Sequence, residues 1–358
     1  MIHVFIGTKA QLIKMAPIMK ELQNRKIPYN FIFSGQHKDT MDLILKNFGI
    51  DKEPDATLYN GRDITGIMQM ANWAIQIIIA NWNRKNLNKL FKHDTKGIIL
   101  NHGDTFSTLL GTFLGKRQGL KTAHIESGLR SHNLFHPFPE EILRLLSFKL
   151  TDYFFAPGEA PLKNLNKVKG VKINTGENTL YDAISATPRA TTQQGQPYGI
   201  ISIHRFENIF SRKMLSKIVN TLTSQNDSIQ KRFILHKPTE NKLREYNLLK
   251  KLEECPSIEL CPRYDYFKFT SLLKNCEYLI TDGGSNQEEC YYLGLPCLLM
   301  RKATEREEGL GENAVLSGYN NKLITAFIQH YKTFKRPPIA GAESPSKIIV
   351  DSISLFSH

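Results

Sequence analysis

Acidic side chains follow two apolar runs that are typical of neighbouring strands. Asp104 comes after the run 97–101 in LNHGDTFST, and Glu126 ends the run 121–126 in KTAHIESGLR. Because adjacent parallel strands end at the same edge of a sheet, we expect both carboxylates on one rim. Neighbouring carboxylates raise one another's pKa, so one can hold a proton while the other accepts one. This pattern predicts acid–base chemistry at carbon; the simpler interpretation of Asp104 is a helix N-cap.

A third acid, Glu140, lies in FHPFPEEILR, where two prolines stiffen the chain before a predicted helix. We expect Glu140 to converge on the same cleft as Asp104 and Glu126. Two simpler interpretations stay open. An acid at a helix start can merely complement the helix dipole, and Arg144, four residues later, can form a surface ion pair with Glu140.

Two turns carry the features of phosphate sites. In IGTKAQLIKMAP, Lys9 and Lys14 lie within two helical turns of a strand end, where helix-start amides attract anions. A solvated helix face is the alternative for these lysines. In TDGGSNQEEC, Gly283, Gly284 and Ser285 form a tight turn into a helix, and the amides of such a turn can hold a diphosphate.

Glu289 and two histidines complete the candidate residues of the second half. Glu289 lies in the helix after the GGS turn, where a carboxylate can accept hydrogen bonds from ribose hydroxyls. His204 ends the run 199–204 and His236 ends the run 232–236, so we expect both at one end of one sheet. Histidine suits a catalytic or phosphate-binding role there, and a hydrogen-bonded structural histidine is the alternative.

These residues need parallel sheets to position them. Short apolar runs alternate with helical patterns such as 11–24 and 39–47, which predicts an α/β protein with helices on both faces of its sheets. The predicted strands are 3–6, 29–33, 97–101, 121–126, 152–156, 199–204, 232–236, 258–261, 278–282 and 297–300. The apolar stretch 73–82 is predicted to be a buried helix.

The alternation pauses at TPRATTQQGQPYG, which contains two prolines and two glycines and has the composition of a linker. A chain of 358 residues is also long for one core. We predict a Rossmann-like domain over 1–186, a linker over 187–198, a second Rossmann-like domain over 199–343, and a final helix over 344–358 that packs on the first domain. Ligand is expected in a cleft between the domains.

Composition narrows the class of protein. The net charge of +13 is spread without dense basic runs, which disfavours nucleic acid as the partner and leaves an anionic membrane surface or a phosphorylated small molecule. A surface charge without function is the simpler interpretation of most of it. No G-x-G-x-x-G follows the first strand and no P-loop motif occurs, so nicotinamide and P-loop enzymes are disfavoured. No signal peptide and no long apolar run is found, so membrane insertion is not expected. Five cysteines without a C-x-x-C pair predict reduced cytoplasmic thiols.

Taken in order, these segments resemble the bacterial UDP-N-acetylglucosamine 2-epimerase family. The matching stretches are GTKAQLIKMAP, SGQHKDTM, HGDTFSTLLG, HIESGLRSHN, TGENTLYDAI, HRFEN, TDGGSNQEE and MRKATERE. The resemblance implies the GT-B architecture, a UDP-sugar substrate, no metal or redox cofactor, and a homodimer. It also implies that the product supplies sugar for surface polysaccharide.

The resemblance further implies residue roles. The catalytic set is Asp104, Glu126, Glu140 and His204, and the substrate-binding set is Lys9, Lys14, Arg144, His236, Gly283, Gly284, Ser285 and Glu289. Two departures stand out. Lys9 occupies the place of a family arginine and lacks its planar fork, and the usual DSGG turn reads DGGS from Asp282.

In the resembled family, UDP leaves as C2 loses its proton, and UDP adds back to the 2-acetamidoglycal with reprotonation on the opposite face. We expect this reversible, non-hydrolysing epimerisation here. One alternative is a hydrolysing 2-epimerase, in which water traps C1 and releases a ManNAc-type sugar. The other is a GT-B glycosyltransferase or a UDP-sugar-binding regulator, neither of which needs a carboxylate cluster.

A second substrate site activates non-hydrolysing members of the family, and Gln36, His37 and Arg62 resemble it. Asp63 stands where the family tends to have an amide. A carboxylate repels a bound diphosphate by about 1 kcal/mol at about 4 Å even in a high dielectric. We therefore expect weak or absent activation; a strand-end turn without ligand is the simpler interpretation of Gln36 and His37.

Overall fold

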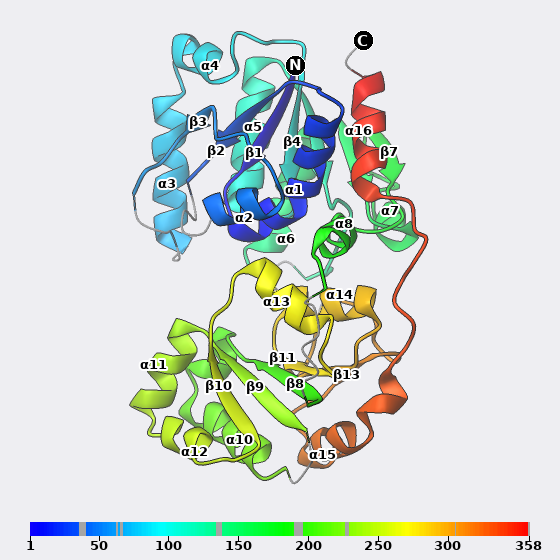
Figure 1. Cartoon of the computed structure of the whole chain (residues 1–358). Helices are drawn as coiled ribbons and strands as arrows, with labels where there is room; N and C mark the ends of the chain where they lie inside the picture. Colours follow the sequence, from blue (N-terminus) through cyan, green and yellow to red (C-terminus); the bar gives the residue numbers. More distant parts are fainter. Residues whose placement is uncertain are drawn as a thin grey trace. The chain divides into compact units, whose positions relative to one another are not determined.

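The computed structural model describes residues 1–35, 41–61, 64, 67–133, 138–189, 196–225, 229–304 and 306–356. The chain forms two compact units (Figure 1). Unit 1 comprises residues Met1–Ala186 together with Ala342–His358, and unit 2 comprises Thr187–Gly341.

Unit 1 is built on a seven-stranded parallel sheet in the order β3-β2-β1-β4-β5-β6-β7. Its strands are β1 (Ile2–Ile6), β2 (Tyr29–Phe33), β3 (Ala56–Thr57), β4 (Ile98–His102), β5 (Lys121–Ile125), β6 (Tyr153–Ala156) and β7 (Val171–Asn174). Strands β1, β2 and β4 are buried along their whole length. A strand covered on both faces needs continuous rather than alternating apolar character, and this explains the apolar runs.

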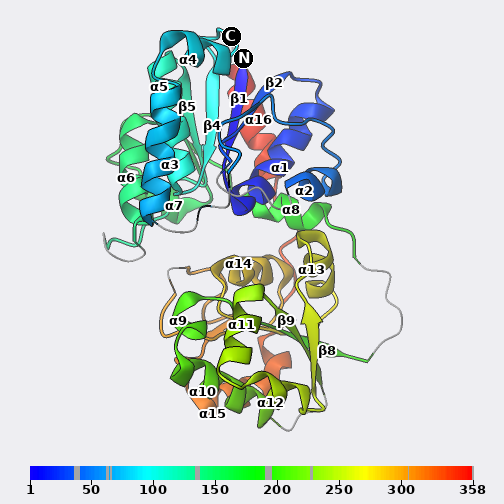
Figure 2. The same cartoon turned by 90° about the vertical axis from the view of Figure 1, so that its left-hand side faces the viewer.

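Nine helices of the described part of unit 1 cover this sheet. They are α1 (Lys9–Asn24), α2 (Met41–Asn47), α3 (Ile67–Ala80), α4 (Arg84–Leu90), α5 (Phe106–Gln118), α6 (Glu140–Leu150), α7 (Glu159–Asn164), α8 (Leu180–Ala186) and α16 (Pro345–Leu355). Figure 2 shows α3, α5 and α6 on one face of the sheet and α1, α2 and α16 on the other. The terminal helix α16 packs on α1 and α8, and its Asp351 pairs with Arg25 of unit 1.

The prediction that the stretch 73–82 is a buried helix is wrong in one respect, because one face of this helix is exposed. Helix α3 buries Trp73 and Ile77, but Ile75 and Ile79 are 53% and 69% exposed. Trp82, just beyond the helix, is also exposed, with the Arg117 guanidinium 3.8 Å from its ring centroid. The segment is apolar on every side, so its periodicity could not show which face the sheet covers.

Unit 2 has a six-stranded parallel sheet in the order β10-β9-β8-β11-β12-β13. Its strands are β8 (Tyr198–Ser202), β9 (Gln230–Leu235), β10 (Ile258–Pro262), β11 (Leu279–Thr281), β12 (Cys297–Leu299) and β13 (Ala314–Leu316). Ile200 and Ile201 belong to different hydrophobic clusters, as do Phe233 and Ile234. Neighbouring residues of a strand point to opposite faces, so this sheet is also buried on both sides.

The helices of unit 2 are α9 (Phe206–Ile209), α10 (Arg212–Thr223), α11 (Lys237–Glu245), α12 (Leu249–Glu253), α13 (Tyr266–Leu273), α14 (Gly284–Leu293) and α15 (Asn321–His330), with a 3₁₀ turn over Tyr331–Phe334. The predicted fold class, α/β with two Rossmann-like units, is confirmed by the two parallel sheets. All five cysteines have free thiols, as predicted. Within the described residues, no helix is both long and apolar enough to span a membrane.

The sequence missed three strands and placed some strand ends too late. The missed strands β3, β7 and β13 lie at or next to the edges of the sheets and have two to four residues. Strand β8 ends at Ser202 and β11 at Thr281, so His204 and Asp282 lie in the loops beyond the strands. This change matters because loop residues at the carboxyl ends of strands are free to face a ligand.

Candidate active site

The turn between β1 and α1 is closed by the side chain of Gln11. Thr8 caps α1, and the N–H groups of Gly7 and Thr8 donate to Gln11 Oε1 at 3.0 and 3.1 Å. Gln11 Nε2 also donates to His102 O at 2.7 Å, which ties this turn to the end of β4. The expectation that amides of this turn hold an anion is therefore wrong for Gly7 and Thr8, since Gln11 Oε1 already accepts from both, the bond from Thr8 being part of a capping box.

Lys14, predicted to face the diphosphate, forms an ion pair with Glu126. Lys14 lies on the buried face of α1, and its Nζ is 2.7 Å from Glu126 Oε1. His102 Nε2 lies 3.1 Å from Glu126 Oε2. All three side chains are less than a tenth exposed. A buried carboxylate needs a counter-charge, and the Lys14 ammonium supplies one to Glu126 at the carboxyl end of β5.

The backbone around Glu126 has an uncommon conformation. Glu126 has φ of 60°, a value that few residues other than glycine adopt. Gly128 has φ of 89°, and a Cβ there would lie 2.2 Å from Pro161 O. Backbone positions of this kind cluster at functional sites, and this one carries the carboxylate that pairs with Lys14.

Asp104 belongs to a second charged cluster. Arg144 of α6 pairs with both Asp104 and Glu141, and Arg130 pairs with Glu141. Burial alone would raise the pKa of Glu141, but hydrogen bonds from Arg130 and from the Ser131 N–H, with the charge of Arg144, lower it. Glu141 is thus an anion that fixes both arginines.

Asp104 is not the N-cap of α5, because the next residue, Thr105, occupies that position. Thr105 caps α5, with its side chain accepting from the Thr108 N–H. The Asp104 side chain is 31% exposed and contacts Arg144 instead. It is therefore both oriented by a cation and accessible to a ligand.

His124 links the two clusters. It lies on β5 next to β4, and its Nε2 is 2.6 Å from Gly103 O. Burial lowers the pKa of His124 to about 4, so the ring is neutral at pH 7 and Nε2 donates to Gly103 O. Gly103 has φ of 69° in the turn that carries Asp104. His124 thus fixes the backbone that presents Asp104.

The structure joins four predicted residues of unit 1 in pairs, Lys14 with Glu126 and Asp104 with Arg144. Glu140 is half-buried at the start of α6, one turn before Arg144, and Lys9 is the first residue of α1. The sequence reasoning missed His102, His124, Arg130 and Glu141. All four lie within the stretches that it singled out, HGD, HIESGLR and PEE, and that nearness was the available signal.

In unit 2, the buried Asp282 organises the loop after β8. Its carboxylate accepts from the N–H groups of His204, at 2.9 and 3.1 Å, and of Arg205, at 2.9 Å. It also accepts from Asn208 Nδ2 at 2.8 Å. Four donor contacts to one carboxylate fix the course of the loop that carries His204. The sequence reasoning recognised Asp282 only as a strand end.

His204 and His236 lie together at the carboxyl ends of β8 and β9. Their rings stack with centroids 4.6 Å apart, and Ser202 Oγ lies 3.3 Å from His236 Nε2. Burial lowers the pKa of His204, although the Asp282 carboxylate opposes this effect. His204 is thus mainly neutral at pH 7 and can donate one hydrogen bond.

The predicted diphosphate turn adjoins His204. Gly283 caps α14, Gly284 and Ser285 are its first residues, and a Cβ built on Gly283 would lie 2.9 Å from His204 Cε1. Glu289 lies on the same helix and is buried. Helix-start amides and a buried acid are therefore presented from one element.

The residues predicted to form a second substrate site, Gln36, His37 and Arg62, lie outside the described residues, as does Asp63.

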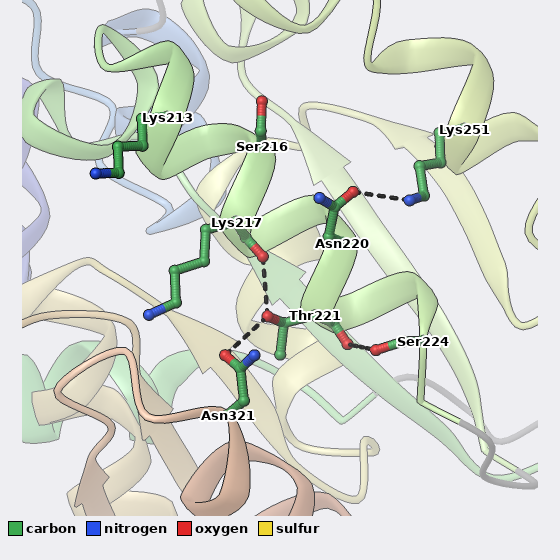
Figure 3. A pocket seen from close by; sticks show the side chains of 8 residues that line it. All are labelled: Lys213, Ser216, Lys217, Asn220, Thr221, Ser224, Lys251 and Asn321. Carbon is green, nitrogen blue, oxygen red and sulfur yellow. Dashed lines mark hydrogen bonds between the residues drawn. The ribbon is translucent and has the colours of Figure 1, made fainter.

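A separate pocket of ≈ 620 Å³ lies on unit 2 (Figure 3). It is lined by Lys213, Ser216, Lys217, Asn220, Thr221, Ser224, Lys251 and Asn321, none of which belongs to the predicted sites. Figure 3 shows Lys251 hydrogen-bonded to Asn220 and Thr221 hydrogen-bonded to Asn321. These contacts join α10 to α12 and α15.

Comparison with known proteins places the chain among sugar-nucleotide enzymes. The UDP-N-acetylglucosamine 2-epimerase family model matches residues 20–345. A UDP-N-acetylglucosamine 2-epimerase of Methanococcus maripaludis is 31% identical over 339 residues, which cover 88% of this chain and 87% of that protein.

Solved structures resemble the whole chain. The UDP-GlcNAc 2-epimerase of Neisseria meningitidis bound to UDP-GlcNAc has a TM-score of 0.82 and 26% identity, and 99% of each chain is covered. The Methanocaldococcus jannaschii enzyme in complex with UDP-GlcNAc and UDP has a TM-score of 0.81, 25% identity and the same coverage. This likeness confirms the GT-B type of the predicted fold.

Proposed function

Because this chain belongs to the UDP-N-acetylglucosamine 2-epimerase family of enzymes, we propose that it interconverts UDP-GlcNAc and UDP-ManNAc, or closely related UDP-N-acetylhexosamines. The observation that carries the proposal is the placement of Glu126 and Asp104 at the ends of the adjacent strands β5 and β4, each held by its own cation.

The carboxylates of unit 1 perform the proton transfers in this proposal. Epimerisation removes the C2 proton from one face of the sugar and returns a proton to the other, so it needs two groups in different surroundings. Glu126 is buried between Lys14 and His102, whereas Asp104 is partly exposed beside Arg144. The reaction is reversible, so each group acts as base in one direction and as acid in the other. We propose Glu140, at the start of α6, as the third acid of this set.

Unit 2 holds the nucleotide in this proposal. The amides at the start of α14 face the diphosphate through Gly283, Gly284 and Ser285, and Glu289 accepts from the ribose hydroxyls. Oriented amides stabilise the charge that develops on UDP as the C1–O bond breaks. A neutral His204 donates a further hydrogen bond to the departing oxygen, with His236 stacked behind it. Lys9 supplies additional positive charge near the diphosphate.

We further propose the non-hydrolysing outcome, in which UDP re-adds to the 2-acetamidoglycal and both products remain nucleotide sugars. Purified protein with UDP-GlcNAc tests the proposal by chromatography of the nucleotides and sugars. An equilibrium mixture of UDP-GlcNAc and a UDP-ManNAc-type product is expected. Stoichiometric free sugar and UDP would favour the hydrolysing alternative, and no conversion of several UDP-N-acetylhexosamines would contradict the proposal altogether.

The exposed face of α3 supports a homodimer. Residues 64–83 contain no charged side chain, although 23% of the whole chain is charged. Ile75 and Ile79 are exposed on this helix, and an exposed apolar patch of this kind marks an interaction surface. Ile79→Lys is expected to convert a dimer to a monomer in analytical ultracentrifugation. A wild-type protein that sediments as a monomer would contradict the dimer.

We propose a cytoplasmic location and a supply of sugar for surface polysaccharide, in keeping with the free thiols. Fractionation of cells that express the protein, and polysaccharide analysis after deletion of its gene, test these points.

Finally, Asp63 leads us to propose weak activation by a second UDP-sugar. A plot of rate against UDP-GlcNAc concentration should be near hyperbolic, and a Hill coefficient well above one would contradict this.

A further inference from the structure

Asn286, which no proposed role yet includes, connects the glycine turn to Glu289. Asn286 Nδ2 donates to Glu289 Oε2 at 2.8 Å. The hydroxyl of Thr281 at the end of β11 lies 3.1 Å from Asn286 Oδ1, and it accepts from the Gly283 N–H at 3.0 Å. Because the Glu289 oxygen accepts this hydrogen bond, the amide nitrogen of Asn286 faces Glu289 and its oxygen faces Thr281. The hydroxyl of Thr281 also lies 2.9 Å from the last carbonyl oxygen of β8, so the contact with Glu289 is the one that sets the orientation of the amide.

The same amide occupies the space beside Gly283. A Cβ on Gly283 would lie 2.7 Å from Asn286 Oδ1 and 2.9 Å from His204 Cε1. Both distances are shorter than real Cβ atoms tolerate. A side chain at position 283 would therefore push on the amide that holds Glu289 and on the ring of His204. This contact gives a physical reason for glycine at a position whose φ, −85°, any residue can adopt.

Glu289 is buried, so the direction of its carboxylate depends on the donors around it. A hydrogen bond to an ionised acceptor is stronger and shorter than a neutral one. The bond from Asn286 runs from the first turn of α14 to the next turn of the same helix, three residues later. It therefore holds Glu289 toward the turn that carries Gly283.

We propose that Asn286 is a positioning residue that orients the Glu289 carboxylate toward the ribose hydroxyls, and that Gly283 keeps the space it needs. This inference rests on the proposed function only in that it takes Glu289 to bind ribose. A purely structural Asn286, which only tied β11 to α14, would affect folding stability but not the recognition of the ribose hydroxyls.

Calorimetric titration with UDP and with 2′-deoxy-UDP tests the inference. The variants are Asn286→Ala, Glu289→Gln and the two combined. Asn286→Ala should weaken UDP binding about 5- to 10-fold, as for the loss of one ordinary hydrogen bond, because Asn286 acts on the nucleotide only through Glu289; 2′-deoxy-UDP binding should weaken much less. The same change made in Glu289→Gln should cause little further loss. For Asn286→Ala, the loss should appear in KM rather than in kcat at saturating substrate.

A matched control is Asn275→Ala in the same unit, since Asn275 follows helix α13 and its Nδ2 donates to Ser271 O of that helix at 3.0 Å. This variant should bind both nucleotides as the wild type does. If the wild type binds no UDP, the proposed function itself is overturned. If the wild type binds UDP but Asn286→Ala loses both nucleotides equally, or loses neither, only the positioning role is overturned.

The space beside Gly283 has its own test. Gly283→Ala should weaken UDP binding, and it should do so less in the Asn286→Ala background, where one of the two close contacts is gone. Equal losses in both backgrounds would overturn this part of the inference.

Asn286→Asp is a second variant, which tests the orientation of Asn286 even if Gly283→Ala does not fold. Two adjacent carboxylates raise one another's pKa. The new acid can therefore donate to Glu289 only when it is protonated, and UDP affinity should fall as pH rises. An affinity as insensitive to pH as that of the wild type would overturn the orientation assigned to Asn286.

Discussion

In unit 1, the carboxyl ends of β4 and β5 present carboxylates paired with Lys14 and Arg144, whereas in unit 2 the ends of β8, β9 and β11 present amides, histidines and buried acids. Asp282, the acid at the end of β11, has its oxygens taken by N–H groups of its own loops. The same position in two similar sheets therefore presents cation-paired carboxylates in one unit and fixed dipoles in the other. We infer that the units divide the reaction into proton transfer and nucleotide binding.

The largest expected effect is on the rate, from unit 1. Glu126→Gln keeps the shape of the side chain but removes its basicity, so kcat should fall about 10²- to 10⁴-fold. UDP affinity should change little, because we propose that unit 2 makes most of the nucleotide contacts. Steady-state kinetics and UDP titration measure the two effects. Glu53→Gln, at an exposed acid of the same unit, is the control and should have wild-type kinetics.

Lys14→Met should cause the largest loss of stability. Breaking a buried ion pair removes the partner of a charge that water cannot reach, and costs about 3 kcal/mol or more. The matched control is Lys116→Met, which removes an ion pair of 2.6 Å to Asp152 whose side chains are 34% and 29% exposed. That change should cost about 1 kcal/mol or less. Urea unfolding measures both, and equal losses would mean that the Glu126 cluster is not tightly held.

His124 should make unit 1 sensitive to acid. Its pKa is about 4 in the folded chain and near 6.5 when unfolded, so the unfolded state binds the proton first as the pH falls. Stability is therefore full above about pH 6.5 and is lost toward pH 4, by about 3 kcal/mol for this histidine. The free energy of unfolding of His124→Gln should vary less over this range. If the free energy of unfolding of this variant varied with pH as much as that of the wild type, His124 would take up a proton as readily in the folded chain as in the unfolded one.

The smallest effect is expected in unit 2. Glu289→Gln keeps the hydrogen-bonding shape but removes the charge, and should weaken UDP binding by about 1–3 kcal/mol. Turnover at saturating substrate should stay near that of the wild type. A large fall in kcat with unchanged UDP affinity would reverse the division between the units.

The sequence predicts the sheets because short continuous apolar runs are typical of strands buried on both faces. It predicts Asp104 and Glu126 on one rim because the carboxyl ends of neighbouring parallel strands lie at the same edge of a sheet. It could not predict that Lys14 contacts Glu126, since that contact joins residues 112 positions apart through the packing of α1 on the sheet. Nor could it separate Glu140 from Glu141. One residue turns a helix by about 100°, and only the packing of α6 decides that Glu141 is the acid buried against Arg130 and Arg144.

The most direct test of the division is proton NMR of UDP-GlcNAc in D₂O with the wild type and with Glu126→Gln. In the wild type, deuterium should enter C2 of both the substrate and its epimer. Glu126→Gln should bind UDP as the wild type does and yet exchange almost no C2 proton in the same time. A C2 proton that is retained through epimerisation by the wild type, or exchange by Glu126→Gln at the wild-type rate, would contradict the assignment of proton transfer to unit 1.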